Sequence, residues 1–448
     1  MNKRTFLKTS SALLAGTMIS PALPSCRNEQ KPLTNWAENL TYGTGNVSYP
    51  KTLEEVQTVI REAGKIRALG SRHSFNTIAD SSVHQLSLQQ LDRVVSLDRQ
   101  ANTVTVEGGM TYGQLCEYLH KEGFALHNLA SLPHISVAGA CATGTHGSGI
   151  KNGNLATVVA GLELVDAAGE AKTLTPNLNG DMFEGAVVGL GGLGVVTKVT
   201  LTVQPTFMMQ QAVYRNLPMK TLATNFETIM ASGDSVSLFT DWQNERVSQV
   251  WIKKKTDATA PVKLDPEFYG ATLATKDMHP LEDLSAENCT SQMGVPGPWY
   301  ERMPHFRMGF TPSSGKELQS EYFVPIEHAY EGIMALVSLN SRITPHLFIS
   351  EIRTIAADTL WMSPHYGKTC VAFHFTWKPE WEAVQKLLPM IEEKLSPFNA
   401  RPHWGKLFTM APAVLQSRIQ KLPQFKALMA EYDPKAKFRN AFLDSALF

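Results

Sequence analysis

Two short segments place polar side chains two residues apart: Glu351 with Arg353, and His374 with Thr376. The flanking residues are largely apolar, so each segment is predicted to be a strand, and alternate residues of a strand leave the same face. Two neighbouring strands would present a carboxylate, a guanidinium, an imidazole and a hydroxyl together, a set that suits a polyhydroxyl ligand. A solvated sheet face with a Glu–Arg ion pair is the alternative, but the apolar flanks favour a pocket wall.

A second candidate feature is the run of residues 128–149, NLASLPHISVAGACATGTHGSG, which is rich in small residues and almost free of charge. Its side chains are too small to form a core, and the run is too apolar for a solvated linker. It is typical of backbone that lies against a large ligand, because missing side chains allow close approach. A short strand predicted at 66–69 leads into a further loop, Gly-Ser-Arg-His-Ser-Phe, at 70–75.

Residues 189–194 match G-x-G-x-x-G, which in a Rossmann fold opens a helix. The residues that follow, VVTKVTLTV at 195–203, have the alternation of a strand, so we do not assign a nicotinamide site. The chain lacks G-x-x-x-x-G-K-[ST], H-E-x-x-H and G-x-S-x-G, and its 13 histidines lack metal-ligand spacing. No metal is predicted, and function must rest on an organic cofactor or on binding alone.

These candidates belong to a large globular chain of 448 residues with 41 basic and 41 acidic side chains and a formal net charge of 0. The length suggests two or three domains, and a neutral chain has no field to attract nucleic acid. Short helices, such as those predicted at 53–63 and 112–121, alternate with strands in an α+β pattern. Thr52 and Glu55 have capping-box spacing. A shift to longer strands and more aromatic residues places a boundary near residue 206.

Residues 1–30 are typical of an export signal, with a basic start, an apolar stretch at 12–19 and a small-residue exit. The apolar stretch is too short to span a bilayer. Lys-Arg-Thr-Phe-Leu-Lys at 3–8 resembles a twin-arginine signal with Lys in place of the first Arg, and Leu-Pro-Ser-Cys at 23–26 resembles a lipobox. The sequence therefore predicts export to the periplasm or cell envelope, with a lipid anchor on Cys26 as the one membrane contact.

Three segments together resemble the vanillyl-alcohol-oxidase type of FAD-binding oxidoreductases, and within it the alditol oxidases that act on xylitol and sorbitol. They are ALGSRHSFN at 68–76, ASLPHISVAGACATGTHGSG at 130–149, and a distal group formed by Glu-Ile-Arg at 351–353, His-Phe-Thr at 374–376 and His-Trp-Gly-Lys at 403–406. The resemblance extends from Asn35 to Asn440. It implies an α+β fold made of an FAD-binding PCMH-type domain at 35–206, a substrate cap domain with a mixed sheet at 207–420, and a tail at 421–448 that returns to the first domain.

The resemblance also implies the cofactor, FAD, bonded covalently through its 8α carbon to His73. The loop at 70–76, the small-residue run and the strand after the glycines would hold it. The implied cofactor-binding residues are Gly70, Ser71, Arg72, His73, Ser74, Phe75, Asn76, Ser131, Ser136, Gly139, Thr143, Gly144, Thr145, His146 and Val196.

The implied reaction is oxidation of a terminal alditol hydroxyl to the aldose, with O2 reduced to hydrogen peroxide. Lys406 or Arg353 would lie against the substrate oxygen or the flavin. His374 is a better candidate than Lys406 to accept the proton, since an unperturbed histidine pKa lies near neutrality. Glu351, Ser131 and Thr376 would hold the polyol hydroxyls. Ala130, just before Ser131, is small enough to be compatible with O2 reaching the flavin.

Two alternatives remain at this point. A sugar-lactone oxidase or dehydrogenase of the gulonolactone type shares the His-Trp-Gly-Lys motif at 403–406. A sugar-binding lipoprotein without catalytic activity could use the same polar residues, but it would leave the small-residue run without a ligand.

Overall fold

The computed structural model describes residues 32–309 and 316–448. Residues 33–448 form one compact unit. The predicted export signal, including Cys26, lies outside the described residues. Across the two described ranges, no helix is both long enough and apolar enough to cross a bilayer.

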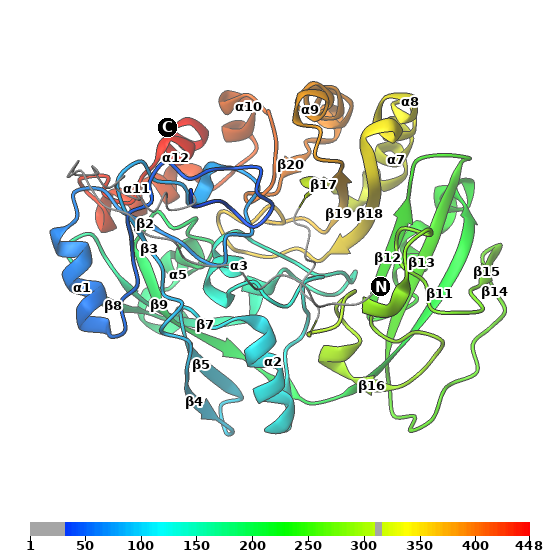
Figure 1. Ribbon diagram of the computed structural model, residues 1–448, viewed down its shortest axis with the longest axis horizontal. Helices are drawn as coiled ribbons and strands as arrows, with labels where there is room; N and C mark the ends of the chain where they lie inside the picture. Colours follow the sequence, from blue (N-terminus) through cyan, green and yellow to red (C-terminus); the bar gives the residue numbers. More distant parts are fainter. Residues whose placement is uncertain (1–31, 310–315) are drawn as a thin grey trace, which may run out of the picture. The chain divides into compact units, whose positions relative to one another are not determined.

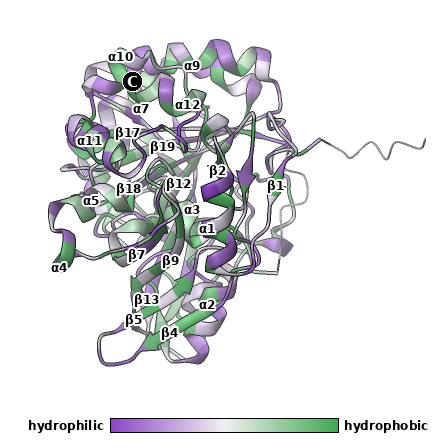
Figure 2. Cartoon of the chain, turned by 90° about the vertical axis from the view of Figure 1, so that its left-hand side faces the viewer, coloured by the Kyte–Doolittle hydropathy of each residue, from purple (hydrophilic) through white to green (hydrophobic). Residues whose placement is uncertain are grey.

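The chain begins with a small parallel sheet and an amphipathic helix. Helix α1 (Leu53–Glu62) buries Val56 and Ile60 and leaves its acidic first turn exposed, so it shows both hydrophilic and hydrophobic colours in Figure 2. Thr52 accepts a hydrogen bond from the Glu55 N–H, but the Glu55 carboxylate accepts from the N–H of Lys51. The predicted capping box is therefore only half formed. The parallel sheet has the order β1 (Val47–Ser48), β3 (Gln85–Leu86) and β2 (Arg67–Ala68).

A five-stranded antiparallel sheet forms the centre of this N-terminal region, by which we mean residues 33–206 (Figure 1). The glycines at 189–194 lead directly into strand β9 rather than into a helix, which agrees with rejecting a Rossmann site. The sheet order is β4 (Val94–Asp98), β5 (Thr103–Glu107), β9 (Val195–Thr202), β7 (Val159–Val165) and β8 (Ala171–Leu174). Besides α1, the α-helices of the region are α2 (Tyr112–Lys121), α3 (Val137–Ala142), α4 (Pro176–Asn179) and α5 (Asp181–Val187). Strand β6 (Phe124–Ala125) pairs with β10 (Gln204–Pro205).

A ten-stranded sheet forms the cap region, residues 207–420. Every named strand pair in it is antiparallel, so the mixed sheet expected in the cap is wrong. Residue patterns predict strands but not their direction, which depends on how each connection returns to the sheet. The strands are β11 (Met208–Pro218), β12 (Ser235–Thr240), β13 (Arg246–Thr256), β14 (Glu267–Phe268), β15 (Ala271–Leu273), β16 (Gly297–Pro298), β17 (Leu318–Pro325), β18 (Leu347–Ile355), β19 (Cys370–Trp377) and β20 (Arg401–Pro402).

Helices cover one face of the central cap strands, as Figure 1 shows for α7 and α9 above β17 and β19. Apolar residues at alternate positions of β19, Phe373 and Phe375, are fully buried in the core that these helices complete. The residues between them must therefore leave the opposite face, toward the N-terminal region. The cap helices are α6 (Leu222–Met230), α7 (Ala329–Val337), α8 (Asn340–Ile343), α9 (Trp381–Leu395) and α10 (Pro412–Ser417).

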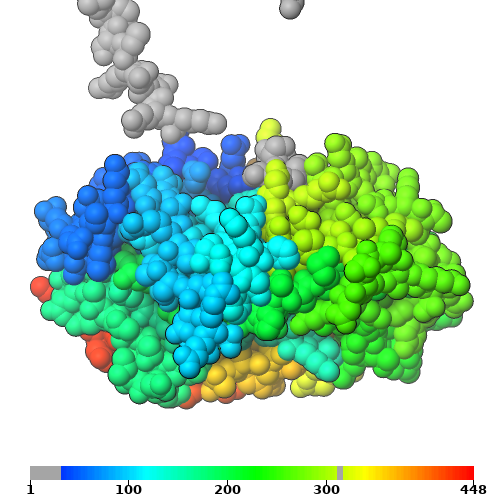
Figure 3. Space-filling model, turned by 90° about the horizontal axis from the view of Figure 1, so that it is seen from below, coloured from blue at the N-terminus to red at the C-terminus, as the bar shows by residue number. Residues whose placement is uncertain are grey.

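The C-terminal segment, with α11 (Leu422–Tyr432) and α12 (Ala441–Leu447), packs on the N-terminal region. The buried Arg67 guanidinium donates to the carbonyl of Phe438 at 3.0 Å, and the Asn440 amide donates to the carbonyl of Asp80 at 2.9 Å. Seen from below, the cyan surface of the N-terminal region adjoins the green surface of the cap region (Figure 3). The change of sheet near residue 206 lies where the boundary is predicted, while separate folding of two domains stays a prediction.

Candidate active site

Three acidic and basic side chains form a row across the central cap strands. Strand pairing sets Glu321 of β17 and Glu351 of β18 directly opposite His374 of β19. Directly paired residues share a face of the sheet, so the row lies on the face away from the cap helices. Arg353 and Thr376 are the next residues of the same strands on that face. The two predicted strands are therefore neighbours, and their four polar side chains come together as expected.

Glu321, which sequence reasoning missed, is the centre of this group. Its Oε1 accepts from Arg353 Nη2 at 2.6 Å and lies 3.3 Å from His146 Nε2. Its Oε2 accepts from Lys406 Nζ at 2.7 Å. Burial alone would raise the pKa of this carboxyl, but Lys406 and Arg353 outweigh burial and hold the pKa well below its ordinary value. The carboxylate is thus ionised and fully buried between two cations.

We call Glu321, Glu351, Arg353, His374 and Lys406 the polar cluster. Within it, Lys406 Nζ also donates to His374 Nδ1 at 2.8 Å, and His374 Nε2 lies 3.2 Å from the hydroxyl of Thr376. Burial and then the Lys406 ammonium hold the pKa of His374 well below its ordinary value. Burial also lowers the pKa of Lys406, although Glu321 opposes it. His374 is therefore a neutral acceptor, and the two candidate proton acceptors share one hydrogen bond.

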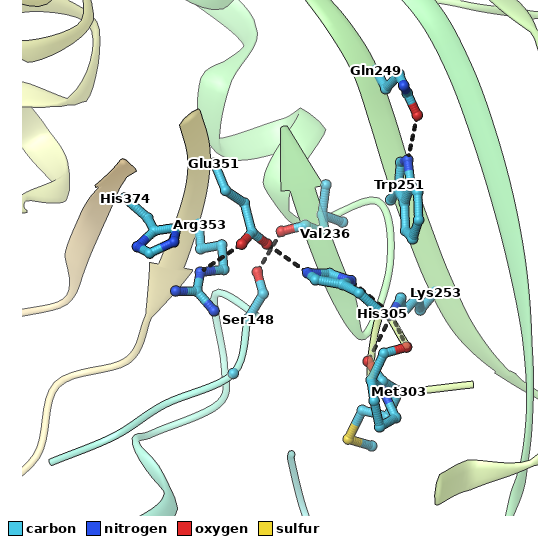
Figure 4. A network of polar contacts seen from close by, with 12 residues as sticks. Ser148, Val236, Gln249, Trp251, Lys253, Met303, His305, Glu351, Arg353 and His374 are labelled. Carbon is cyan, nitrogen blue, oxygen red and sulfur yellow. Dashed lines mark hydrogen bonds and ion pairs between the residues drawn. The ribbon is translucent and has the colours of Figure 1, made fainter. Parts of the chain in front are cut away.

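The Glu351 carboxylate contacts a histidine, His305, as well as Arg353 (Figure 4). His305 Nε2 donates to Glu351 Oε1 at 2.8 Å, and Arg353 Nε lies 3.6 Å from Oε2. Burial would raise the pKa of Glu351, but Arg353 and His305 together hold it well below its ordinary value. The Nε of Arg353 finds no hydrogen-bond partner among the described residues although it is buried. Glu351 Oε2 and Arg353 Nε therefore remain as an acceptor and a donor that a ligand hydroxyl could use.

The loop that carries Lys406 is fastened to the loop at 70–76 in the N-terminal region. Phe75 N–H donates to the carbonyl of Gly405 at 2.7 Å. The Asn76 side chain donates to the carbonyls of Trp404 at 2.9 Å and Lys406 at 2.7 Å. The Asn76 amide thus braces the Lys406 loop, and its assignment to the cofactor stays a prediction. The polar cluster is in this way fixed relative to the small-residue loops.

One continuous cavity of about 820 Å³ joins the polar cluster to those loops. Its volume is in the range of cofactor and substrate sites. Every cofactor-binding residue named from the sequence lines it except Asn76 and Gly144, and Ser131, Thr376 and Ala130 line it as well. The assignment of Gly144 to the cofactor stays a prediction: its φ of +64° turns the chain, and a Cβ there would lie 3.1 Å from Pro364 Cδ. Gly144 thus serves the turn and its packing.

The wall of this cavity fits FAD because it is built largely from backbone. A Cβ on Gly70 would lie 2.8 Å from Ser136 Oγ, and one on Gly139 would lie 2.7 Å from the same atom. A side chain on either glycine would therefore require the Ser136 hydroxyl, at the start of helix α3, to shift. Without those side chains, this part of the wall lets a dinucleotide approach the backbone closely.

His73 is held in this groove as a neutral ring. Its imidazole stacks on Trp36 with the ring centroids 4.8 Å apart, and Trp36 N–H donates to the Arg72 carbonyl at 2.8 Å. Arg72 has a φ of 64°, in the left-handed region that L-residues rarely adopt. Burial, with His134 and Arg72, lowers the pKa of His73 to about 3. The ring nitrogens form no hydrogen bond within the described parts of the chain.

Three residues of the site had weak sequence signals. Glu321 is the one carboxylate in a largely apolar strand, and a buried charge of this kind could have been noticed. His305 has Lys253 of strand β13 beside it, with Nζ 3.3 Å from His305 Nδ1, and no periodicity connects the two residues. His146, assigned to the flavin, lines the cavity but also contacts Glu321. Over the described ranges, no group of three or more His, Cys, Asp or Glu side chains could hold a metal ion.

Fold and site together define an FAD-binding oxidoreductase. Residues 45–175 match the family model of the FAD binding domain, and residues 309–446 match that of D-arabinono-1,4-lactone oxidase. Among solved structures, cholesterol oxidase from B. sterolicum is similar with a TM-score of 0.76 at 15% identity, covering 97% of this chain and 100% of that one. Glucooligosaccharide oxidase from Acremonium strictum is similar with a TM-score of 0.68 at 16% identity, covering 91% and 93%.

The sequence relatives define the family more narrowly. The chain is 47% identical to alditol oxidase from Streptomyces sp. over 418 residues, which cover 93% of this chain and 99% of that one. It is 27% identical to L-gulono-1,4-lactone dehydrogenase from Mycobacterium tuberculosis over 425 residues, which cover 91% and 97%. The chain belongs to the alditol oxidase family of FAD-dependent oxidoreductases. The alternative of a binding protein without catalytic activity is thereby set aside.

Replacing Glu321 by Gln should destabilise the fold, because the variant leaves buried Lys406 without a carboxylate partner and Arg353 with Glu351 alone. Breaking a buried pair of this kind costs about 3–5 kcal/mol. The measurement is the free energy of unfolding of the holoenzyme at neutral pH. Since the folded-state pKa of Glu321 is lowered, its contribution is present above the unfolded-state pKa of about 4.3 and is lost as pH falls below it. The deficit of the variant should therefore narrow in acid.

The double variant Glu321→Gln with Lys406→Met is the matched control. It also removes the cation that Glu321→Gln leaves without an ion-pair partner, and it should recover part of the lost stability. A Glu321→Gln variant as stable as the wild type would contradict the role of this carboxylate.

Proposed function

We propose that this protein oxidises the terminal hydroxyl of an alditol such as xylitol or sorbitol to the aldose, with O2 as the electron acceptor and hydrogen peroxide as the second product. The observation that carries the proposal is the continuous cavity that joins the backbone groove for FAD to the polar cluster. Family membership and 47% identity to an alditol oxidase support it.

The charges of the polar cluster favour a neutral substrate. Glu321 and Glu351 balance Arg353 and Lys406, and the lowered pKa of His374 keeps that ring neutral. A sugar acid or sugar phosphate would add negative charge to a site whose two cations are already balanced by two carboxylates. A polyol adds only hydroxyls, each of which can donate to Glu351 Oε2 and accept from Arg353 Nε. The hydroxyls of Thr376 and Ser131 offer further contacts along the cavity.

The chain's own residues handle the proton of the reacting hydroxyl. Lys406 and His374 share one hydrogen bond, so we assign proton uptake to the pair rather than to either side chain alone. Glu321 stabilises the pair when it carries the extra proton, because its carboxylate lies 2.7 Å from Lys406 Nζ. FAD held by the loop at 70–75 and the small-residue run would supply the hydride acceptor for the terminal carbon and the reactivity toward O2. Ala130 presents only a methyl group to the cavity, which leaves room for O2.

A sugar-lactone oxidase or dehydrogenase is the second candidate, favoured by the match of residues 309–446 to the D-arabinono-1,4-lactone oxidase model. The lower identity of 27% to a lactone dehydrogenase places it behind the first. Both substrates are neutral and hydroxylated, so the charges of the site do not distinguish an alditol from a lactone. The rate of turnover with each substrate does distinguish them.

Purified holoenzyme should release hydrogen peroxide in air with xylitol or sorbitol and far less with L-gulono-1,4-lactone. Lys406→Met should lower kcat by roughly 10²–10⁴-fold, the range for loss of general acid–base catalysis, while the flavin absorption is retained. Lys386→Met is the matched control, because Lys386 lies exposed on α9 and should leave kcat unchanged. Peroxide formation with the lactone but not with alditols would overturn the proposal.

We also propose that FAD is bonded covalently to His73. The ring lines the groove, is neutral, and has nitrogens that no described residue engages, so a lone pair is available to form the bond. Trp36 holds the ring by stacking. The neutral imidazole, which the lowered pKa maintains, would be the nucleophile: a C–N bond would replace a C–H bond at the 8α carbon, and the flavin would take up the electron pair and protons until O2 reoxidises it.

Denaturing the wild-type protein in acid should leave the yellow flavin attached to the polypeptide. The His73→Ala variant should release it under the same conditions, because no covalent bond remains. His346→Ala is the matched control, because His346 pairs with Glu380 on the cap and does not line the cavity, so the flavin should stay attached. Free flavin from the denatured wild type would show that the bond is absent.

For the N-terminal residues we propose export and lipid attachment at Cys26, on the strength of the basic start and the lipobox-like Leu-Pro-Ser-Cys at 23–26. Mass spectrometry of the protein from its native membrane fraction should find a chain that begins at a lipid-modified Cys26. A chain that still begins at Met1 would contradict this assignment.

A further inference from the structure

Lys253 is a buried amine that the proposed mechanism does not use, and burial lowers its pKa to about 7. It lies on β13 and is 1% exposed. Its Nζ donates to the carbonyls of Met303 at 2.6 Å and Pro304 at 2.9 Å, and lies 3.3 Å from His305 Nδ1 (Figure 4). An ammonium has three N–H donors and no acceptor, so these three partners satisfy it completely. Burying a lysine this deeply costs desolvation free energy, and the three contacts compensate for it.

The contacts of Lys253 determine which nitrogen of His305 carries hydrogen. Glu351 is ionised and can only accept, so His305 Nε2 must be the donor across the 2.8 Å contact. His305 Nδ1 is then the acceptor that faces Lys253. Two aromatic rings meet the imidazole edge to face, Phe239 with centroids 5.4 Å apart and Trp251 with centroids 5.3 Å apart. Both the tautomer and the orientation of His305 are thereby set.

We propose that Lys253 and His305 form a positioning pair that holds the Glu351 carboxylate as an acceptor for a substrate hydroxyl and so sets the affinity of the site for polyols. The inference rests on the proposed function. With Oε1 occupied by His305, Glu351 can rotate only by breaking that bond, and Oε2 stays beside Arg353. His305 is a positioning residue in this account, since it acts through Glu351.

Removing the His305 donor should also change the pH dependence of binding. His305 is one of the groups that lower the pKa of Glu351, so its loss raises that pKa. As the solution is acidified, Glu351 would then become protonated at a higher pH than in the wild type. A protonated carboxyl group is a weaker hydrogen-bond acceptor for a polyol hydroxyl than a carboxylate. The charged and titratable groups around Glu351 are Arg353 on its own strand, His374 on the neighbouring strand β19, Glu321 on the next strand but one, Lys406, His305 and Lys253.

The test compares His305→Leu with His305→Gln in the holoenzyme, using steady-state oxidation of xylitol across pH. His305→Leu should raise KM by roughly tenfold to hundredfold, the factor expected for one lost hydrogen bond to a charged group, with a smaller change in kcat. The acid limb of kcat/KM should move to higher pH by about one unit or more. His305→Gln keeps an N–H donor and should return both quantities toward wild type. A folded His305→Leu variant with wild-type KM and acid limb would overturn the proposal.

Thr290→Val provides the matched control. The Thr290 hydroxyl donates to the Pro304 carbonyl at 2.8 Å, so the variant loosens the same segment without touching the bond between His305 and Glu351. It should lower the melting temperature but leave the KM and the pH profile unchanged. A Thr290→Val profile that shifts like that of His305→Leu would mean that loop packing, not the His305 donor, sets affinity, and would contradict the proposal.

A second measurement does not depend on activity. In holoenzyme labelled with ¹⁵N-histidine, the ring signals that disappear in His305→Gln belong to His305. They should show a neutral ring protonated at Nε2, and Lys253→Met should shift the Nδ1 signal because it removes the donor to that nitrogen. A His305 ring in mixed tautomers contradicts the pair, whereas a wild-type enzyme without alditol turnover contradicts the proposed function. The two failures are therefore distinguishable.

Discussion

The site depends on one buried carboxylate, Glu321. A charge removed from water is tolerated only when other charges and hydrogen bonds compensate it. Glu321 meets this condition through contacts with Arg353 on the next strand but one, Lys406 in a distant loop and His146 in the N-terminal region. Segments more than 170 residues apart in the sequence therefore pack together around this carboxylate. The compensation also leaves the substrate end of the cavity neutral overall, which matches a polyol.

Two connections carry this constraint outward to the flavin groove. The loop at 403–406 is bonded on one side to β17, through His403 N–H to the Glu321 carbonyl at 3.0 Å, and on the other to the loop at 70–76. The small-residue run crosses to the cap where Gly149 N–H donates to the Thr354 carbonyl at 2.9 Å, next to Arg353. The substrate contacts and the cofactor loops are thus parts of one hydrogen-bonded frame, so a substrate held by the cluster has a fixed direction toward the flavin.

Local rules were sufficient to predict some of this from sequence. Alternation predicted that Glu351 and Arg353 share a face, and small-residue composition indicated backbone against a large ligand. Strand direction was beyond those rules, as the antiparallel cap sheet shows. Asn76 and Gly144 were assigned from neighbours in a motif, although one braces the Lys406 loop and the other makes a turn. Glu321, His305 and Lys253 were missed because their partners come from distant segments, and burial decides their importance.

Anaerobic mixing of the holoenzyme with xylitol, followed by admission of air, tests the central claim most directly. The account predicts that the visible absorption of oxidised flavin bleaches in the mixing step and returns with air as hydrogen peroxide appears. Bleaching without return in air would contradict O2 as the acceptor. A yellow protein that no alditol bleaches would contradict the assignment of the polar cluster to polyol oxidation.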